Sequence, residues 1–329
     1  MSKADDRTQC ILPDANRRRV WEYVSRSPLN SLWNLQAVPA ATVAQNTWKA
    51  ILADRLFGRA AELAFYFLFA LFPTLFSASS ILGLAAHSAN QFYEKLLHYL
   101  ALVIPTAALG TILETFNETA PTATTGKVTF GFIAAIWSAS VGISAIQEAM
   151  NTVYKVKDTR SFFRARIYAI GLTIILSGIF TLILSGMLGG DFFAELVNRR
   201  MPQHFLAMII SNLVRVVGWA IAIVLLALAF ALIYYWGPDL ETRRWRWFTP
   251  GGGIGILGWV LASVGLRVYL TFFDSYSVMY GSLGAVIILL MWFYISGLML
   301  LLGAEINSEI EAAAAQIKVD LHTVPTPSP

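Results

Sequence analysis

The stretch LAMIISNLVRVVGWAIAIVLLALAFALIYYW, residues 206–236, decides the class of this fold. It contains a single charged side chain, Arg215, in a run longer than the roughly 20 apolar residues that a helix needs to cross the hydrocarbon core of a bilayer. Its last residues, Tyr234, Tyr235 and Trp236, carry amphipathic rings that favour the depth of the lipid headgroups. The stretch therefore predicts a membrane-spanning helix that ends at a membrane surface.

Composition extends this prediction to the whole chain. Hydrophobic residues make up 57% of the 329 residues and charged residues only 13%, against roughly 25% charged residues in a typical soluble domain. A soluble fold of this size could not cover its apolar surface with so few charges. We predict an all-α, polytopic membrane helix bundle of about six transmembrane helices. The other five spans lie at Glu62–Ala85, Val128–Ala149, Ile167–Gly190, Gly251–Phe273 and Gly281–Gly303.

Lysine and arginine residues predict the orientation of the bundle. They concentrate before the first span, between the second and third spans and between the fourth and fifth, with few in the alternate loops. Because cytoplasmic loops are enriched in these residues, we predict a multi-pass protein of the inner membrane with both termini in the cytoplasm. The same asymmetry accounts for the net charge of +4, so we expect no nucleic-acid partner.

The spans divide the chain into three regions. Residues 1–60 form a cytoplasmic segment, residues 61–305 the transmembrane domain, and residues 306–329 a cytoplasmic tail whose Pro- and Thr-rich end we expect to be disordered. The first region contains an apolar helical face made of Ala44, Thr47, Trp48, Ile51, Leu52 and Leu56. This helix is predicted to lie in the inner membrane interface, with a soluble helix packed on cytoplasmic loops as the alternative. Residues 92–113, in the longest outer loop, predict an amphipathic or re-entrant helix.

Polar residues inside membrane spans are candidates for function because they are costly in lipid. A stripe at helical spacing in the second span is predicted to face the protein interior, and it consists of Ser140, Ser144, Glu148 and Asn151. Further polar residues lie at the cytoplasmic ends of the first and last spans, and these are Glu62, Glu305 and Asn307. The acidic side chains either lock helix ends through salt bridges, for which Arg55, Arg59 and Arg160 are available, or form an inward-facing gate or ion site.

Two arginines lie toward the outer ends of their spans. Arg215 is in the fourth span and Arg267 in the fifth, and these consecutive spans are predicted to pack as an antiparallel pair with both arginines at similar height. One interpretation is that each side chain snorkels to the outer headgroups. The other is a shared basic site for a phosphate or carboxylate, which a guanidinium group grips well.

Proline and glycine residues mark candidate hinges. Pro73 lies inside the first span, and Pro250, Gly251, Gly252 and Gly253 open the fifth. The following GIGILG, residues 253–258, matches a dinucleotide-binding pattern in letters only, because no strand precedes it, and its glycines are interpreted as thinning a helix face for packing. The histidines form no metal-spaced pair and Cys10 is the single cysteine, so we expect no cofactor and no metal site.

Four motifs resemble the YihY/BrkB family of inner-membrane proteins. They are GRAAELAFYFLFALFP (58–73), QEAMNTVY (147–154) with Arg160, YSVMYGSLGA (276–285) and LGAEIN (302–307). The resemblance covers roughly residues 40 to 310 and implies a six-helix bundle in the inner membrane. The family has carried the label ribonuclease BN, and a role in moving lipids or solutes of the envelope has been suggested for its members.

The function expected from the sequence is transport or flipping of an envelope lipid or amphipathic solute. The alternative is a non-transporting scaffold for envelope or division machinery. An enzyme is not expected, because the clustered carboxylates or histidines of a hydrolytic ribonuclease are missing from the sequence pattern. The expected partners are the lipid bilayer, an anionic lipid or amphipathic solute, and a second copy of the chain in a homo-oligomer.

Overall fold

The computed structural model describes residues 20, 24, 32–33, 39–84, 125–200, 204–272 and 282–323. Within these residues the regular structure is entirely helical. The helices are α2 (Ala40–Ala53), α3 (Leu56–Leu84), α6 (Thr125–Val153), α7 (Phe162–Arg200), α8 (His204–Trp236), α9 (Pro250–Phe272) and α11 (Ser282–Thr323). The predicted outer-loop helix at 92–113 and the end of the predicted tail lie outside the described residues.

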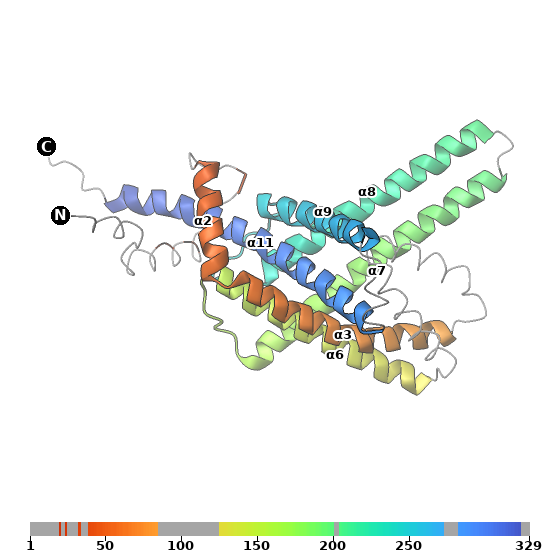
Figure 1. The fold of residues 1–329 in the computed structure, drawn as a ribbon, viewed down its shortest axis with the longest axis horizontal. Helices are drawn as coiled ribbons and strands as arrows, with labels where there is room; N and C mark the ends of the chain where they lie inside the picture. Colours follow the sequence, from red (N-terminus) through yellow and green to blue (C-terminus); the bar gives the residue numbers. More distant parts are fainter. Residues whose placement is uncertain are drawn as a thin grey trace.

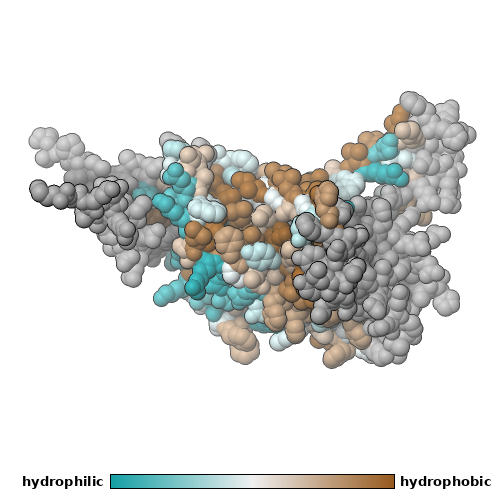
Figure 2. Space-filling model, in the orientation of Figure 1, coloured by the Kyte–Doolittle hydropathy of each residue, from teal (hydrophilic) through white to brown (hydrophobic). Residues whose placement is uncertain are grey.

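Six of these helices are long and apolar enough to cross a membrane, which confirms the predicted class of fold. The spans are Leu56–Ser77, Val128–Val153, Phe162–Ala194, Met208–Trp236, Pro250–Leu270 and Gly284–Gln316. Large apolar side chains cover their outer surfaces, as expected for helices solvated by lipid. Figure 2 shows hydrophobic residues across the middle of the molecule.

The last span differs most from its predicted bounds. We predicted that Glu305 and Asn307 close the sixth helix, and this is wrong, because α11 continues without a break to Thr323. Hydropathy shows where a chain leaves lipid, whereas a helix ends only where its backbone loses helical geometry or a capping residue stops it. The alanine-rich continuation, residues 311–315, has high helix propensity and carries α11 onward.

The helices pack in pairs around α11 (Figure 1). α3 lies along α6 and α7 along α8, while α11 contacts both α3 and α9. We call the end of the bundle that holds α2 and the C-terminal part of α11 the terminal end, and the opposite end the distal end. The predicted α8–α9 pair is wrong, because α8 packs along α7 and α9 along α11, and α8 meets α9 over only a short stretch.

The glycine-rich start of α9 crosses α11 at backbone contact. A Cβ atom on Gly303 would lie 2.5 Å from the carbonyl oxygen of Gly251, so only glycine fits at this crossing. The amide of Asn307 caps the start of α9, since its Oδ1 accepts a hydrogen bond of 2.9 Å from the backbone N–H of Gly251. The Thr249 hydroxyl accepts a second hydrogen bond, of 3.0 Å, from the N–H of Gly252. The packing role predicted for the glycines of residues 253–258 is confirmed at Gly255 and Gly258, where an added Cβ would lie 3.0 Å from the carbonyl oxygen and 2.7 Å from the sulfur of Met299 on α11.

The predicted interfacial helix is α2, and it runs across α11 in Figure 1. Val43 packs against Ile310 and Ala314 of α11, which makes one side of α2 part of the protein interior. Of the predicted apolar face, Thr47 and Ile51 are buried, whereas Trp48 and Leu52 are exposed. The helix therefore combines packing on α11 with an exposed apolar strip of the kind that suits a membrane interface.

The glycine crossing generates a stability prediction. Gly303→Ala places a methyl group against the Gly251 carbonyl oxygen, so we expect it to destabilise the fold by roughly 1–3 kcal/mol through overpacking. The control is Gly178→Ala on α7, where an added Cβ has no neighbour within 4 Å, so helix propensity should leave stability unchanged or higher. Thermal unfolding of the purified variants in detergent measures both effects. Equal melting temperatures for the two variants would contradict the assigned crossing.

Candidate functional site

Buried polar side chains gather at the terminal end of the bundle. They come from α6, from the segment that leads into α9, and from α11. The set consists of Gln147, Asn151, Thr249, Glu305, Asn307, Ser308 and Glu311. Because polar groups inside lipid are costly, we take this layer as the candidate functional site.

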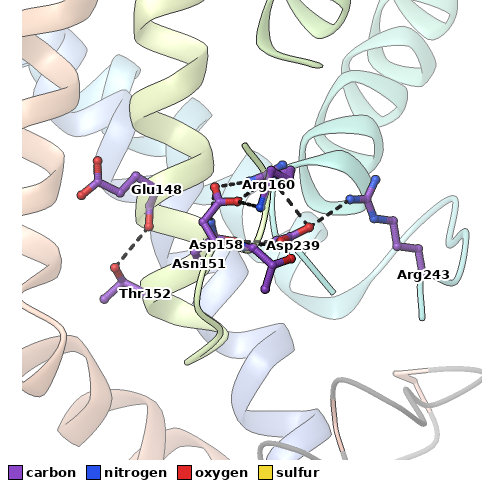
Figure 3. A network of polar contacts seen from close by, with 8 residues as sticks. Glu148, Asn151, Thr152, Asp158, Arg160, Asp239 and Arg243 are labelled. Atoms are coloured by element: carbon purple, nitrogen blue, oxygen red, sulfur yellow. Dashed lines mark hydrogen bonds and ion pairs between the residues drawn. The ribbon is translucent and has the colours of Figure 1, made fainter. Parts of the chain in front are cut away.

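An ion-pair network, which we call the latch, joins the α6–α7 turn to the segment after α8 (Figure 3). Its members are Asn151, Asp158, Arg160, Asp239 and Arg243. Arg160 makes two hydrogen bonds to the carboxylate of Asp158, of 2.8 Å from Nε and 2.7 Å from Nη2. The same Nε lies 3.8 Å from Oδ1 of Asp239, whose carboxylate is also 3.6 Å from Arg243. A guanidinium group thus bridges carboxylates from two separate segments.

Asn151 completes the latch from the last turns of α6. Its Nδ2 donates to Asp158 at 3.2 Å, and its Oδ1 accepts from the backbone N–H of Asp239 at 2.7 Å. The Arg160 side chain is only 4% exposed, so it depends on these carboxylates for compensation of its charge. Its hydrogen bonds lower the pKa of Asp158, and the same contacts raise the pKa of Arg160. The contact therefore favours the charged forms of Asp158 and Arg160.

A second polar group surrounds α11 beside the latch. Glu305 is fully buried, and neither of its carboxylate oxygens has a hydrogen-bond partner among the described residues. Ser308, also fully buried, donates from its hydroxyl to the carbonyl oxygen of Val153 at 2.9 Å. Glu311 forms an ion pair with Arg246, which ties α11 to the segment that leads into α9.

Two of the candidate acidic residues, Glu62 and Glu148, contact the same arginine. Arg59 Nη1 lies 3.3 Å from Glu148 and 3.7 Å from Glu62, which confirms the salt-bridge interpretation for these helix ends. The side chain of Glu148 is 69% exposed, so the prediction that the whole α6 stripe faces the interior is wrong at this position. At about 3.6 residues per turn, residues 140 and 151 lie on the same side of α6. A step of four residues exceeds one full turn, so two such steps from residue 140 carry Glu148 away from that side.

The remaining stripe residues, Ser140 and Ser144, lie further from the terminal end along α6. Ser140 is buried and Ser144 is partly buried. Arg166 of α7 reaches both the hydroxyl of Ser144, at 3.5 Å, and the ring of Trp137, with its guanidinium carbon 4.2 Å from the ring centroid. A guanidinium group over an indole face is a favourable cation–π contact.

The outer arginines lie on helices with different partners. Arg215 is exposed on α8 and Arg267 partly buried on α9. Close approach between these helices involves Phe230 and Tyr234 of α8 with Gly255 of α9, toward the terminal end. The α8–α9 packing that motivated a shared anion site is therefore limited to this short stretch in the described residues, and the site stays a prediction.

Sequence reasoning named Arg160 as an ion-pair partner but not the residues that bind it. Asp158 and Asp239 both follow the end of a membrane helix within a few residues, in loops that the lysine and arginine pattern placed on one side. Their predicted position on the same side of the membrane was the one signal that could have indicated this pairing. Among the described residues, no group of three or more His, Cys, Asp and Glu side chains is placed to hold a metal ion.

Comparison with known proteins places these motifs in a wider group. A family model described as virulence factor BrkB matches residues 47–325. YfkH of Bacillus subtilis, named as a ribonuclease-like protein, is 30% identical over 251 residues, which are 76% of this chain and 88% of YfkH. The UPF0761 membrane protein Smlt0865 of Stenotrophomonas maltophilia is 29% identical over 280 residues, 80% of this chain but 60% of that protein. A UPF0761 membrane protein of Xanthomonas oryzae is 26% identical over 266 residues, with 80% and 60% of the chains covered. No solved structure matches the chain.

The latch generates a prediction for Arg160. Arg160→Gln removes the cation between two carboxylates, so we expect a loss of stability on the order of 2 kcal/mol at neutral pH, while the exposed Arg164→Gln should match wild type. Because the pKa of Asp158 is lowered in the fold, this contribution is complete above about pH 4 and is lost as the pH falls through the folded-state pKa. Thermal unfolding across pH should therefore show the difference between Arg160→Gln and wild type shrinking in acid. A difference that is the same in acid and at neutral pH would contradict the latch.

Proposed function

The chain belongs to the virulence factor BrkB family of integral membrane proteins, and we propose that it transports or flips an amphipathic envelope lipid or solute across the bacterial inner membrane. The described spans and the lysine and arginine pattern support this location, with the terminal end toward the cytoplasm. Transport through a bilayer requires a route that is closed at one face while it is open toward the other.

The observation that carries the proposal is the different packing of the two ends. At the terminal end the latch joins α6 and the α6–α7 turn to the segment after α8, and the glycine crossing joins α9 to α11. Toward the distal end, α7 and α8 diverge from α9 and α11, as Figure 1 shows. Among the described residues, the helices are joined at the cytoplasmic end and two pairs diverge toward the other, which is the arrangement expected for one state of an alternating-access cycle.

The diverging helix pair carries polar groups that suit an amphipathic substrate. α7 exposes Ser177, Thr181 and Ser185 within its membrane span, and α8 exposes Arg215. Hydroxyls and a guanidinium group offer hydrogen bonds to a headgroup, while the apolar side chains between them contact acyl chains. An anionic, lipid-like substrate fits this mixture better than a small hydrophilic solute.

We propose no enzymatic activity for the chain, although YfkH is named as a ribonuclease-like protein. A hydrolase needs acidic or basic groups free to exchange protons with a substrate. Glu62 and Glu148 are instead engaged by Arg59, and Asp158 and Asp239 by Arg160. These four carboxylates therefore serve ion pairs.

A disulfide lock across the latch tests the proposal. The hydroxyl and the backbone N–H of Thr159 both donate to Asp239, at 2.7 and 2.9 Å, so cysteines at these two positions lie close enough to be joined. In a Cys10→Ser background, Thr159→Cys with Asp239→Cys should flip fluorescent phosphatidylglycerol in proteoliposomes when reduced. We expect at least tenfold slower flipping when it is oxidised, because the cytoplasmic end can no longer open.

The single-cysteine variants control for oxidation itself and should flip at the same rate in both conditions. Equal rates for the oxidised and reduced double variant would contradict the latch as a gate. Flipping by the wild-type chain no faster than in protein-free vesicles would contradict anionic phospholipid transport and favour the scaffold alternative.

A further inference from the structure

Glu305 is a carboxyl group that neither the latch nor the other ion pairs use. It lies inside the span Gly284–Gln316 of α11 and has no solvent exposure. Neither carboxylate oxygen accepts a hydrogen bond within the described residues. Glu311, two turns further along the same helix, is also buried but is paired with Arg246. The ion pair with Arg246 therefore compensates the burial of Glu311, whereas Glu305 lacks such a contact among the described residues.

The charged groups that face Glu305 do not neutralise it. Lys155, just after α6, is its favourable neighbour, but the ammonium group of Lys155 already forms an ion pair with Asp54 at the end of α2. The carboxylate of Glu309, one turn further along α11, repels the ionised form of Glu305. Tyr154 faces it from the end of α6 as a neutral phenol. An ionised carboxylate in this setting has no cation of its own, and burial of such a group costs several kcal/mol.

We propose that Glu305 is a proton-binding site, which holds a neutral carboxylic acid while α11 is packed as described and releases its proton when the terminal end opens to water. The inference rests on complete burial, on two oxygens without hydrogen-bond partners and on a neighbouring lysine that is already paired. Proton binding follows from the packing of α11 alone, whereas proton release on opening rests on the proposed transport function.

A proton fits this position better than a metal ion. A metal cation requires several oxygen ligands around it. The nearest polar groups on α11 are committed elsewhere, since the Ser308 hydroxyl donates to Val153 and Asn307 caps α9. A proton needs only one oxygen of Glu305 itself. The site therefore belongs to the class of membrane-embedded carboxyl groups that bind and release protons.

Infrared spectroscopy of the purified chain in an alkyl glycoside detergent, which contains no ester or carboxyl C=O group, tests the protonation state directly. A neutral carboxylic acid has a C=O stretching band that an ionised carboxylate lacks. We expect this band at neutral pH in wild type and in the control Glu148→Gln, and its loss in Glu305→Gln. A band equally strong in Glu305→Gln and wild type would overturn the proposal, as would its disappearance from wild type when Na⁺ or Mg²⁺ is added at constant pH.

Labelling of wild type with dicyclohexylcarbodiimide keeps the proposal testable if Glu305→Gln fails to fold. The carboxylic acid of Glu305 adds across one C=N bond of the carbodiimide, so that its oxygen bonds to the central carbon and its proton passes to nitrogen. The acyl group then migrates from oxygen to nitrogen and gives a stable N-acylurea. Mass spectrometry should find the added reagent on the peptide of Glu305 at least tenfold more often than on those of Glu62 and Glu148, whose side chains are exposed ion-pair members. Equal labelling of all three, or none at Glu305, would overturn the site, and neither result depends on transport.

Discussion

An ionised side chain that is buried in the protein must be matched by an opposite charge or by a proton, and this constraint orders the terminal end of the bundle. Arg160 is matched by Asp158 and Asp239, and Glu311 by Arg246. The Arg160–Asp239 and Arg246–Glu311 pairs join segments that are distant in sequence, so the need for compensation also fixes how the helix ends meet. Glu305 has no such cation of its own, and a bound proton satisfies the same constraint.

The backbone contact between α9 and α11 sets which helices can move together. Gly251 and Gly303 allow an approach that a larger residue would prevent, and Asn307 adds a cap from α11 to the start of α9. α9 and α11 therefore form one unit, to which α3 is packed. The α7–α8 pair has little contact with this unit, and the latch links the turn that leads into α7 to the segment that leads into α9. Opening of the latch is thus the change that would let one unit rock against the other.

Hydropathy and charge were enough to predict six spans, because lipid imposes length and composition on any helix that crosses it. They could not predict that α11 extends to Thr323, since leaving lipid does not end a helix. The prediction of an α8–α9 pair was wrong because neighbours in sequence need not pack together, and the glycine face of α9 packs against α11. Asp239 could not be assigned to Arg160 from sequence, because their contact depends on how two loops meet.

The distance between the distal halves of α8 and α9 tests the account most directly. Leu213 and Val264 are both exposed there and accept spin labels in a Cys10→Ser background. Double electron–electron resonance on the reconstituted chain should show one main distance in wild type and a second, shorter population in Arg160→Gln, whose broken latch lets the two units rock. The same single distance in both proteins would show a rigid bundle and contradict the proposed alternation.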